Sequence, residues 1–120
     1  MMMLDEDWLE LFWNAANGTL EQRKLRWKEG AACCVTMAGK QYPQQSSKGV
    51  LIEQLPAENV ASKIFYAGVR QQDSKLYTNG GRVLSVCHHN VSLQEAIRGC
   101  YELVSQVNCN DLAYRSDIGG

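Results

Sequence analysis

A glycine pair beside an arginine is the part of this sequence whose residue types most suggest a bound ligand. Residues 76–87, LYTNGGRVLSVC, place Asn79, Gly80, Gly81 and Arg82 between two apolar runs. Glycines let a backbone approach an anionic ligand closely, and a guanidinium beside them can bind the oxygens of that ligand. The same pattern is also typical of a tight hairpin turn, because such turns need residues that tolerate positive φ. The residue types leave both interpretations open.

A second candidate for anion binding is the stretch 40–49, KQYPQQSSKG, which contains Lys40, Tyr42, Lys48 and Gly49. The stretch has no periodicity and one proline, so the sequence predicts a loop there. Two lysines among small polar residues could contact a phosphate, or they could belong to a solvated surface loop. Neither of the nucleotide-binding glycine patterns, G-x-x-x-x-G-K-[ST] and G-x-G-x-x-G, occurs in the chain.

The cysteines and histidines show no spacing typical of a metal site. The number of cysteines is odd and no C-x-x-C pair occurs, so the sequence predicts neither a disulfide framework nor a zinc site. Cys33-Cys34 and His88-His89 are adjacent pairs, and adjacent side chains in a strand point to opposite faces. We therefore expect reduced cysteines that pack as small apolar side chains, exposed loop histidines, no metal ligands and no catalytic residue.

The overall composition is that of one globular domain. The chain has 120 residues, a formal net charge of -1 and no basic surplus, which argues against a nucleic-acid-binding protein. No apolar run approaches the roughly 18 residues that cross a membrane. The start, MMMLDEDW, lacks the features of a secretory signal. These observations predict a cytoplasmic protein with no nucleic-acid partner and no membrane partner.

Residues 4–18, LDEDWLELFWNAANG, have the pattern of an amphipathic helix. Asp5 or Asp7 can cap its N-terminus, and Gly18 follows its end. The predicted apolar stripe consists of Trp8, Leu11, Phe12 and Ala15. An apolar face this wide on a short helix needs a partner surface.

The rest of the chain alternates short apolar runs with turn residues and ends in a second helix. The predicted strands are residues 31–39, 50–55, 63–68, 75–78 and 82–87. Strands in close succession indicate an antiparallel meander. Ser92 and Glu95 form a capping-box pattern that predicts a helix start. The resulting fold class is α+β: a mostly antiparallel sheet with a capped helix on one face.

Several of these stretches, taken together, resemble a known family. The chain contains ACCVTMAGKQYP, then FYAG, TNGGRVLSV, the SLQEA helix start and YRSDIG, in that order. The residues of these motifs and their order resemble the C-terminal region of phosphoribosylamine–glycine ligase. This family, also called glycinamide ribonucleotide synthetase, belongs to the ATP-grasp ligases. The resemblance covers nearly the whole chain.

The resemblance implies a function in de novo purine biosynthesis. The full-length family enzyme joins phosphoribosylamine to glycine through an acyl phosphate of glycine, using ATP and Mg²⁺ or Mn²⁺. Its nucleotide and metal sites belong to the ATP-grasp domain, so neither cofactor is expected to bind this fragment. The resemblance makes Asn79, Gly80, Gly81 and Arg82 the candidate substrate-binding residues.

The resemblance also implies a division of the chain. Residues 1–30 would be a remnant of the ATP-grasp domain, its closing helix and a connector, and residues 31–120 the C-terminal domain. The expected partner is the upstream ATP-grasp domain, with self-association through the face of Trp8, Leu11 and Phe12 as a further possibility. We expect a fragment that is inactive alone and supplies a wall of the substrate cleft and packing for the catalytic domain. The alternative is a stand-alone module that binds small anions or another protein.

Overall fold

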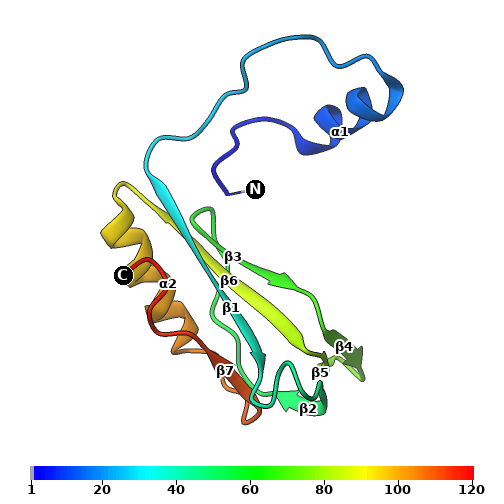
Figure 1. Cartoon of the computed structure of the whole chain (residues 1–120), viewed down its shortest axis with the longest axis vertical. Helices are drawn as coiled ribbons and strands as arrows, with labels where there is room; N and C mark the ends of the chain where they lie inside the picture. Colours follow the sequence, from blue (N-terminus) through cyan, green and yellow to red (C-terminus); the bar gives the residue numbers. More distant parts are fainter. Residues whose placement is uncertain (1) are drawn as a thin grey trace.

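Seven strands in residues 2–120, the part of the chain that this computed structural model describes, form two antiparallel sheets (Figure 1). The larger sheet has the strand order β3-β6-β1-β7, and the smaller sheet has the order β2-β5-β4. The strands are β1 (Ala31–Gly39), β2 (Ser47–Ile52), β3 (Ser62–Tyr66), β4 (Val69–Gln72), β5 (Lys75–Gly80), β6 (Arg82–Asn90) and β7 (Leu112–Tyr114). Two helices, α1 (Trp8–Asn17) and α2 (Leu93–Val104), complete the fold.

Helix α2 packs on β1 and β6 and covers one face of the larger sheet (Figure 1). Residues of a strand alternate between the two faces. The register partners Val35 and Val86 are both almost fully buried and belong to the core beneath α2. The core also contains Cys33, Met37, Leu84, Ala96, Cys100 and Val104. The other face of the β1–β6 pair, which we call the open face, carries Cys34, Thr36, Ser85 and Cys87.

Ser92 is the N-cap of α2, as the sequence predicts, although the Glu95 carboxylate accepts from the Ser92 hydroxyl and not from the Ser92 backbone N–H as in a full capping box. Its Oγ accepts a hydrogen bond from the backbone N–H of Glu95 at 3.3 Å and donates one to the Glu95 carboxylate at 3.2 Å. These contacts satisfy a backbone donor that the first turn of a helix leaves without a partner. The helix is thereby fixed at the point where the chain leaves β6.

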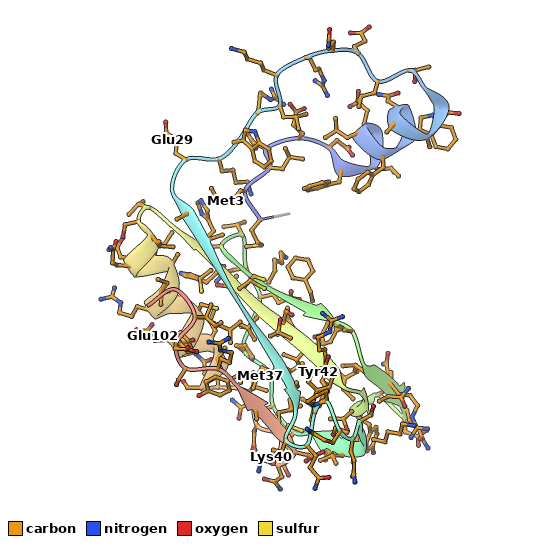
Figure 2. The ribbon with its side chains drawn as sticks, viewed as in Figure 1. Met3, Glu29, Met37, Lys40, Tyr42 and Glu102 are labelled. Atoms are coloured by element: carbon orange, nitrogen blue, oxygen red, sulfur yellow. The ribbon has the colours of Figure 1, made fainter. Side chains whose placement is uncertain are left out.

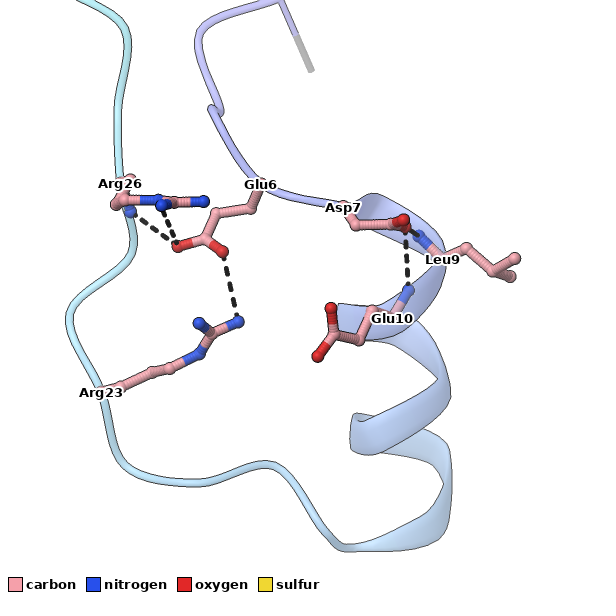
Figure 3. A network of polar contacts seen from close by, with 6 residues as sticks. All are labelled: Glu6, Asp7, Leu9, Glu10, Arg23 and Arg26. Atoms are coloured by element: carbon pink, nitrogen blue, oxygen red, sulfur yellow. Dashed lines mark hydrogen bonds and ion pairs between the residues drawn. The ribbon is translucent and has the colours of Figure 1, made fainter.

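Helix α1 and the connector after it form an arm that extends from one end of β1 (Figure 1). Asp7 is the N-cap, because its Oδ1 accepts hydrogen bonds from the backbone N–H groups of Leu9 at 2.8 Å and Glu10 at 3.1 Å (Figure 3). Gly18 ends the helix with a φ of 68°. The predicted helix, its aspartate cap and its glycine end are therefore confirmed.

Glu6 closes the arm on itself. Its carboxylate accepts a hydrogen bond from the backbone N–H of Arg26 at 3.0 Å and lies 3.2 Å from the guanidinium of Arg23 (Figure 3). The hydrogen bond from Arg26, together with both positive charges, lowers the pKa of Glu6. Leu4 forms an antiparallel bridge with Trp27, next to the contact between Glu6 and Arg26. Polar contacts, rather than a large core, hold the arm together.

The apolar surface of α1 differs from the predicted stripe. Leu11, which belongs to the stripe, is buried in the arm at 8% exposure. Leu9 and Trp13, which lie outside the stripe, are 76% and 68% exposed, and Phe12 is 60% exposed. The arm therefore presents apolar side chains to solvent, but these are Leu9, Phe12 and Trp13 and not the full predicted stripe.

The hairpin interpretation of Asn79-Gly80-Gly81 is wrong. Gly80 ends β5 and Arg82 begins β6, yet these two strands belong to different sheets. The chain passes through Gly81 from the smaller sheet into the larger one instead of turning back. Neither glycine has positive φ; the positive-φ glycines in residues 2–120 are Gly18, Gly30, Gly49 and Gly119. A positive φ therefore does not explain why glycine occurs at positions 80 and 81.

The antiparallel α+β fold class is confirmed, but the meander is wrong. Among the neighbouring strands of the chain, β4 and β5 pair directly, through a turn at Asp73 and Ser74 with φ values of 47° and 61°. The larger sheet instead joins β1 to β6 and β7, which lie far along the chain. The predicted loop 40–49 ends earlier than expected, because β2 already begins at Ser47. Strand β4 was not predicted, because its sequence VRQQ has little apolar character.

In residues 2–120, neither helix has the length and apolar content that a membrane-spanning helix requires.

Removal of the Ser92 cap tests the packing of α2. We expect Ser92→Ala to lower the free energy of unfolding by about 1 kcal/mol, because a backbone donor loses its partner. Urea unfolding followed by circular dichroism measures the change. Ser116→Ala, at an exposed position near the C-terminus, is the control and should lie within about 0.5 kcal/mol of the parent. Equal effects of the two substitutions would contradict the cap assignment.

Candidate functional site

A hollow of about 610 Å³ lies where β6 begins. Tyr42, which Figure 2 labels near the end of the molecule where the two sheets meet, borders it. The lining residues are Thr36, Tyr42, Pro43, Ser46, Ala67, Gly81, Arg82, Leu84 and Ser85. They come from β1, the loop before β2, the segment after β3, and β6. Four parts of the sequence therefore meet at one surface depression.

Two glycine backbones cross next to this hollow. The N–H of Asn79 donates to the carbonyl of Gly68 at 2.7 Å, and the N–H of Gly68 donates to the carbonyl of Arg82 at 3.0 Å. A Cβ atom on Gly68 would lie 2.7 Å from the Cα of Gly80, and one on Gly80 would lie 2.9 Å from the Cα of Gly68. Side chains do not fit at either position, because the neighbouring atoms belong to backbone. The close approach explains the need for glycine at Gly80.

Gly81 is in contact with the ring of Tyr42. A Cβ atom at Gly81 would lie 2.5 Å from the Cδ2 atom of that ring. The carbonyl of Gly81 accepts a hydrogen bond from Gly39 at 2.8 Å, and the carbonyl of Gly39 accepts one from Tyr42 at 2.9 Å. The loop that carries Tyr42 is thus fixed against the start of β6 by backbone hydrogen bonds and by the packing of its ring.

The polar groups of the hollow suit an anion. Arg82 is the charged residue among its lining residues. The ion pairs within residues 2–120 involve Arg23, Arg26, Arg98 and Arg115, and none of them involves Arg82. The Thr36 and Ser85 hydroxyls, which lie 2.9 Å apart, and the hydroxyls of Tyr42 and Ser46 add further donors. A guanidinium with several hydroxyl donors and no carboxylate can bind a phosphate or carboxylate group.

The structure separates the four predicted substrate-binding residues into two groups. Gly81 and Arg82 line the hollow, whereas Asn79 and Gly80 lie behind it at the end of β5. Asn79 and Gly80 hold the crossing with Gly68 and thereby position Arg82.

The second candidate, the stretch 40–49, contributes Tyr42, Pro43 and Ser46 to the hollow but neither of its lysines. Sequence reasoning missed Thr36 and Ser85. They lie 49 positions apart, and the register of β1 on β6 is what brings them together. A pattern within either strand carries no signal of that pairing.

The histidines lie apart from the hollow and on opposite faces, as adjacent strand residues should. The Nδ1 of His88 is 2.9 Å from the Oγ of Ser62, and the Nε2 of His89 is 2.7 Å from the carbonyl oxygen of Glu29. Both lie in β6 rather than in a loop, and both are partly buried. Residues 2–120 contain no group of three or more His, Cys, Asp or Glu side chains arranged to hold a metal ion.

Comparison with known proteins gives consistent matches in sequence. The family described as "Phosphoribosylglycinamide synthetase, C domain" matches residues 32–120. A phosphoribosylamine–glycine ligase of Fusobacterium nucleatum is 39% identical over 120 residues, and one of Rhizobium meliloti is 40% identical over 119 residues. These matches cover 98% and 99% of this chain but 28% of each relative. The chain therefore spans a little over a quarter of the length of the curated relatives that it matches.

A solved structure agrees with the sequence matches. The crystal structure of phosphoribosylamine–glycine ligase from Thermotoga maritima superimposes with a TM-score of 0.80 at 35% sequence identity. The superposition covers 95% of this chain and 28% of that chain. The arrangement of strands and helices described above is thus found within a much longer protein.

Substitution of Gly81 tests the packing of Tyr42 at the hollow. We expect Gly81→Ala to lower the free energy of unfolding by about 1–3 kcal/mol, because the new methyl group overlaps the Tyr42 ring. In a Tyr42→Ala background the same substitution should cost at least about 1 kcal/mol less, since the obstructing ring is gone. Urea unfolding of the four proteins in this cycle measures both values. In the control background Tyr42→Phe, which keeps the ring, the cost should be unchanged; an equal cost in all backgrounds would contradict the contact.

Proposed function

The chain belongs to the phosphoribosylglycinamide synthetase C-domain family, and from this premise we propose that it works as the C-terminal portion of a phosphoribosylamine–glycine ligase. Such an enzyme makes glycinamide ribonucleotide from phosphoribosylamine, glycine and ATP in de novo purine biosynthesis. The observation that carries the proposal is the hollow at the start of β6, where an arginine without an ion-pair partner among the described residues meets several hydroxyl groups. These groups suit the phosphate of a phosphoribosyl substrate.

ATP and the divalent metal ion, Mg²⁺ or Mn²⁺, would bind to the upstream ATP-grasp domain. Residues 2–120 provide no cluster of three or more His, Cys, Asp or Glu side chains, which supports a metal site in the upstream domain. A site for phosphoryl transfer depends on positioned positive charges and metal ions. The role of this chain would therefore be to bind and orient a substrate, and we expect no turnover from the chain alone.

Arg82 would contact the phosphate of phosphoribosylamine directly. Gly81 would allow the substrate and the Tyr42 ring to approach the backbone, whereas Asn79 and Gly80 would hold that backbone in place through the crossing with Gly68. The carbonyls of Gly81 and Val83, on either side of Arg82, accept backbone hydrogen bonds from neighbouring segments. The backbone of Arg82 is therefore already fixed before a ligand binds. A preorganised group loses less conformational entropy on binding.

The arm of residues 1–30 would pack on the upstream domain. The family match begins at residue 32, whereas the sequence relatives match nearly the whole chain. This difference supports a boundary near residue 30, with the arm belonging to the preceding domain. Its exposed apolar side chains, Leu9, Phe12 and Trp13, would be covered by that domain. Self-association through α1 is the competing arrangement, and light scattering of the isolated chain distinguishes it.

We place the protein in the cytoplasm, together with the other enzymes of purine biosynthesis. The five cysteines are free in the structure, which suits a reducing compartment.

A chimera tests the proposed function. This chain replaces the matching 28% of the Fusobacterium nucleatum relative, and ADP release is measured with and without phosphoribosylamine and glycine. We expect ADP release that requires both substrates, because the chain would complete the substrate cleft. A folded chimera that binds ATP but forms no product would contradict the proposal.

Variants of Arg82 in this chimera test the role of the hollow. We expect Arg82→Ala to raise the KM for phosphoribosylamine on the order of 10- to 100-fold, since a charge-assisted hydrogen bond contributes about 1.5–3 kcal/mol. The KM of Arg82→Lys should lie between those of the parent chimera and of Arg82→Ala. Lysine keeps the positive charge but cannot form the two parallel hydrogen bonds of a guanidinium. Arg98→Ala removes an exposed arginine of α2 and is the control, with unchanged kinetics expected. An unchanged KM in Arg82→Ala would remove Arg82 from the substrate site.

A further inference from the structure

Two cysteines lie directly opposite each other on the open face of the larger sheet. Cys34 of β1 and Cys87 of β6 are register partners in the antiparallel β1–β6 pair. The register places the next pair on this face at Thr36 and Ser85, whose hydroxyls contact each other at 2.9 Å. Side chains of such opposed residues point the same way and meet. The Cys34 and Cys87 thiols are therefore neighbours, although 53 positions separate them in the sequence.

This arrangement matches the spacing that a disulfide needs. Directly opposed residues of antiparallel strands have Cα atoms about 4.5 or 5.5 Å apart, depending on the type of pair. Disulfides span Cα separations of roughly 4.4–6.8 Å, so either type of pair can be bridged without separating the strands.

Access to the two thiols is unequal. Cys34 is exposed, whereas Cys87 is buried at 4% exposure. Both border a hollow of about 360 Å³ whose other lining residues include Met2, Met3 and Phe65. A small reagent can therefore reach Cys34 from solvent, whereas the Cys87 side chain is almost fully covered.

The electrostatics of the pair favour Cys34 as the nucleophile. A hydrogen bond from the Cys87 thiol is the main cause that lowers the pKa of Cys34 to about 6. The same contact with Cys34, together with burial, raises the pKa of Cys87. Two further cysteines lie near this part of the sheet, Cys33 and Cys100, and both belong to the buried core beneath α2. Burial raises the pKa of Cys100 to about 12. Thiolates, not thiols, react with disulfides, so Cys34 is the reactive member.

We propose that Cys34 and Cys87 form a reactive dithiol that low-molecular-weight disulfides oxidise to a cross-strand disulfide, with Cys34 as the attacking thiol. The inference is independent of the proposed function, because it rests on the register and exposure of the two cysteines.

The reaction proceeds by two exchanges. The Cys34 thiolate attacks one sulfur of a small disulfide RSSR, so that a bond to Cys34 forms, the RS–SR bond breaks and one RS⁻ leaves. Cys34 then no longer carries the thiolate whose contact raises the pKa of Cys87. Cys87 gives its proton to solvent, attacks the Cys34 sulfur and expels the second RS⁻. Two protein thiols thereby lose two electrons, and RSSR is reduced to two thiols.

Incubation of the chain with glutathione disulfide tests the proposal. After an acid quench and alkylation, peptide mass spectrometry should find Cys34 linked to Cys87, with two fewer free thiols per chain. In Cys87→Ser, a mixed disulfide with glutathione should persist at Cys34, because the resolving thiol is missing. In Cys34→Ser, modification at Cys87 should be at least about tenfold slower than at Cys34 in the parent chain, because Cys87 is buried.

Cys109→Ser is the matched control, since Cys109 is a free, half-buried cysteine outside the pair. This variant should form the Cys34–Cys87 link at the parent rate, and circular dichroism should show that all three variants fold. A persistent glutathione adduct on Cys34 in the parent chain, without linkage to Cys87, would overturn the proposal. So would modification of Cys109 in preference to Cys34.

Discussion

The close approach of the Gly68 and Gly80 backbones is the contact on which the rest of this structure depends. A Cβ atom on either glycine would lie less than 3 Å from the Cα of the other. Hydrogen bonds from Asn79 to Gly68 and from Gly68 to Arg82 hold the crossing. Because the two backbones pass this closely, β5 can leave the smaller sheet and continue as β6, one of the two central strands of the larger sheet. The same crossing fixes the position of Arg82 at the edge of the hollow.

The larger sheet has two faces with different roles. Helix α2 covers one face and forms the core with Val35 and Val86. The open face carries the hydroxyl pair of Thr36 and Ser85 and, next to it, the thiol pair of Cys34 and Cys87. Ser85 borders both hollows on this face, so the proposed substrate site and the proposed dithiol adjoin each other. Both proposed sites lie on the open face, because apolar packing against α2 fills the opposite face.

Local sequence patterns predicted the elements well and their pairing poorly. The caps at Asp7 and Ser92 and the apolar run of β1 are local signals, and the structure confirms all three. The hairpin at Asn79-Gly80-Gly81 was wrong, because the glycines serve close contacts with Gly68 and Tyr42 rather than a reversal of the chain. Such contacts depend on distant segments, which no local pattern describes. For the same reason Arg82 could be named as a candidate from the sequence, whereas the pairing of Thr36 with Ser85 could not.

We propose that the hollow beside Gly81 and Arg82 forms a wall of the substrate cleft in a longer enzyme. The most direct measurement is a crystal structure of the chimera with bound glycinamide ribonucleotide. We predict that the Arg82 guanidinium lies at hydrogen-bonding distance, about 2.7–3.2 Å, from the phosphate oxygens of that product. A structure in which the product is bound elsewhere and the hollow faces solvent would contradict it.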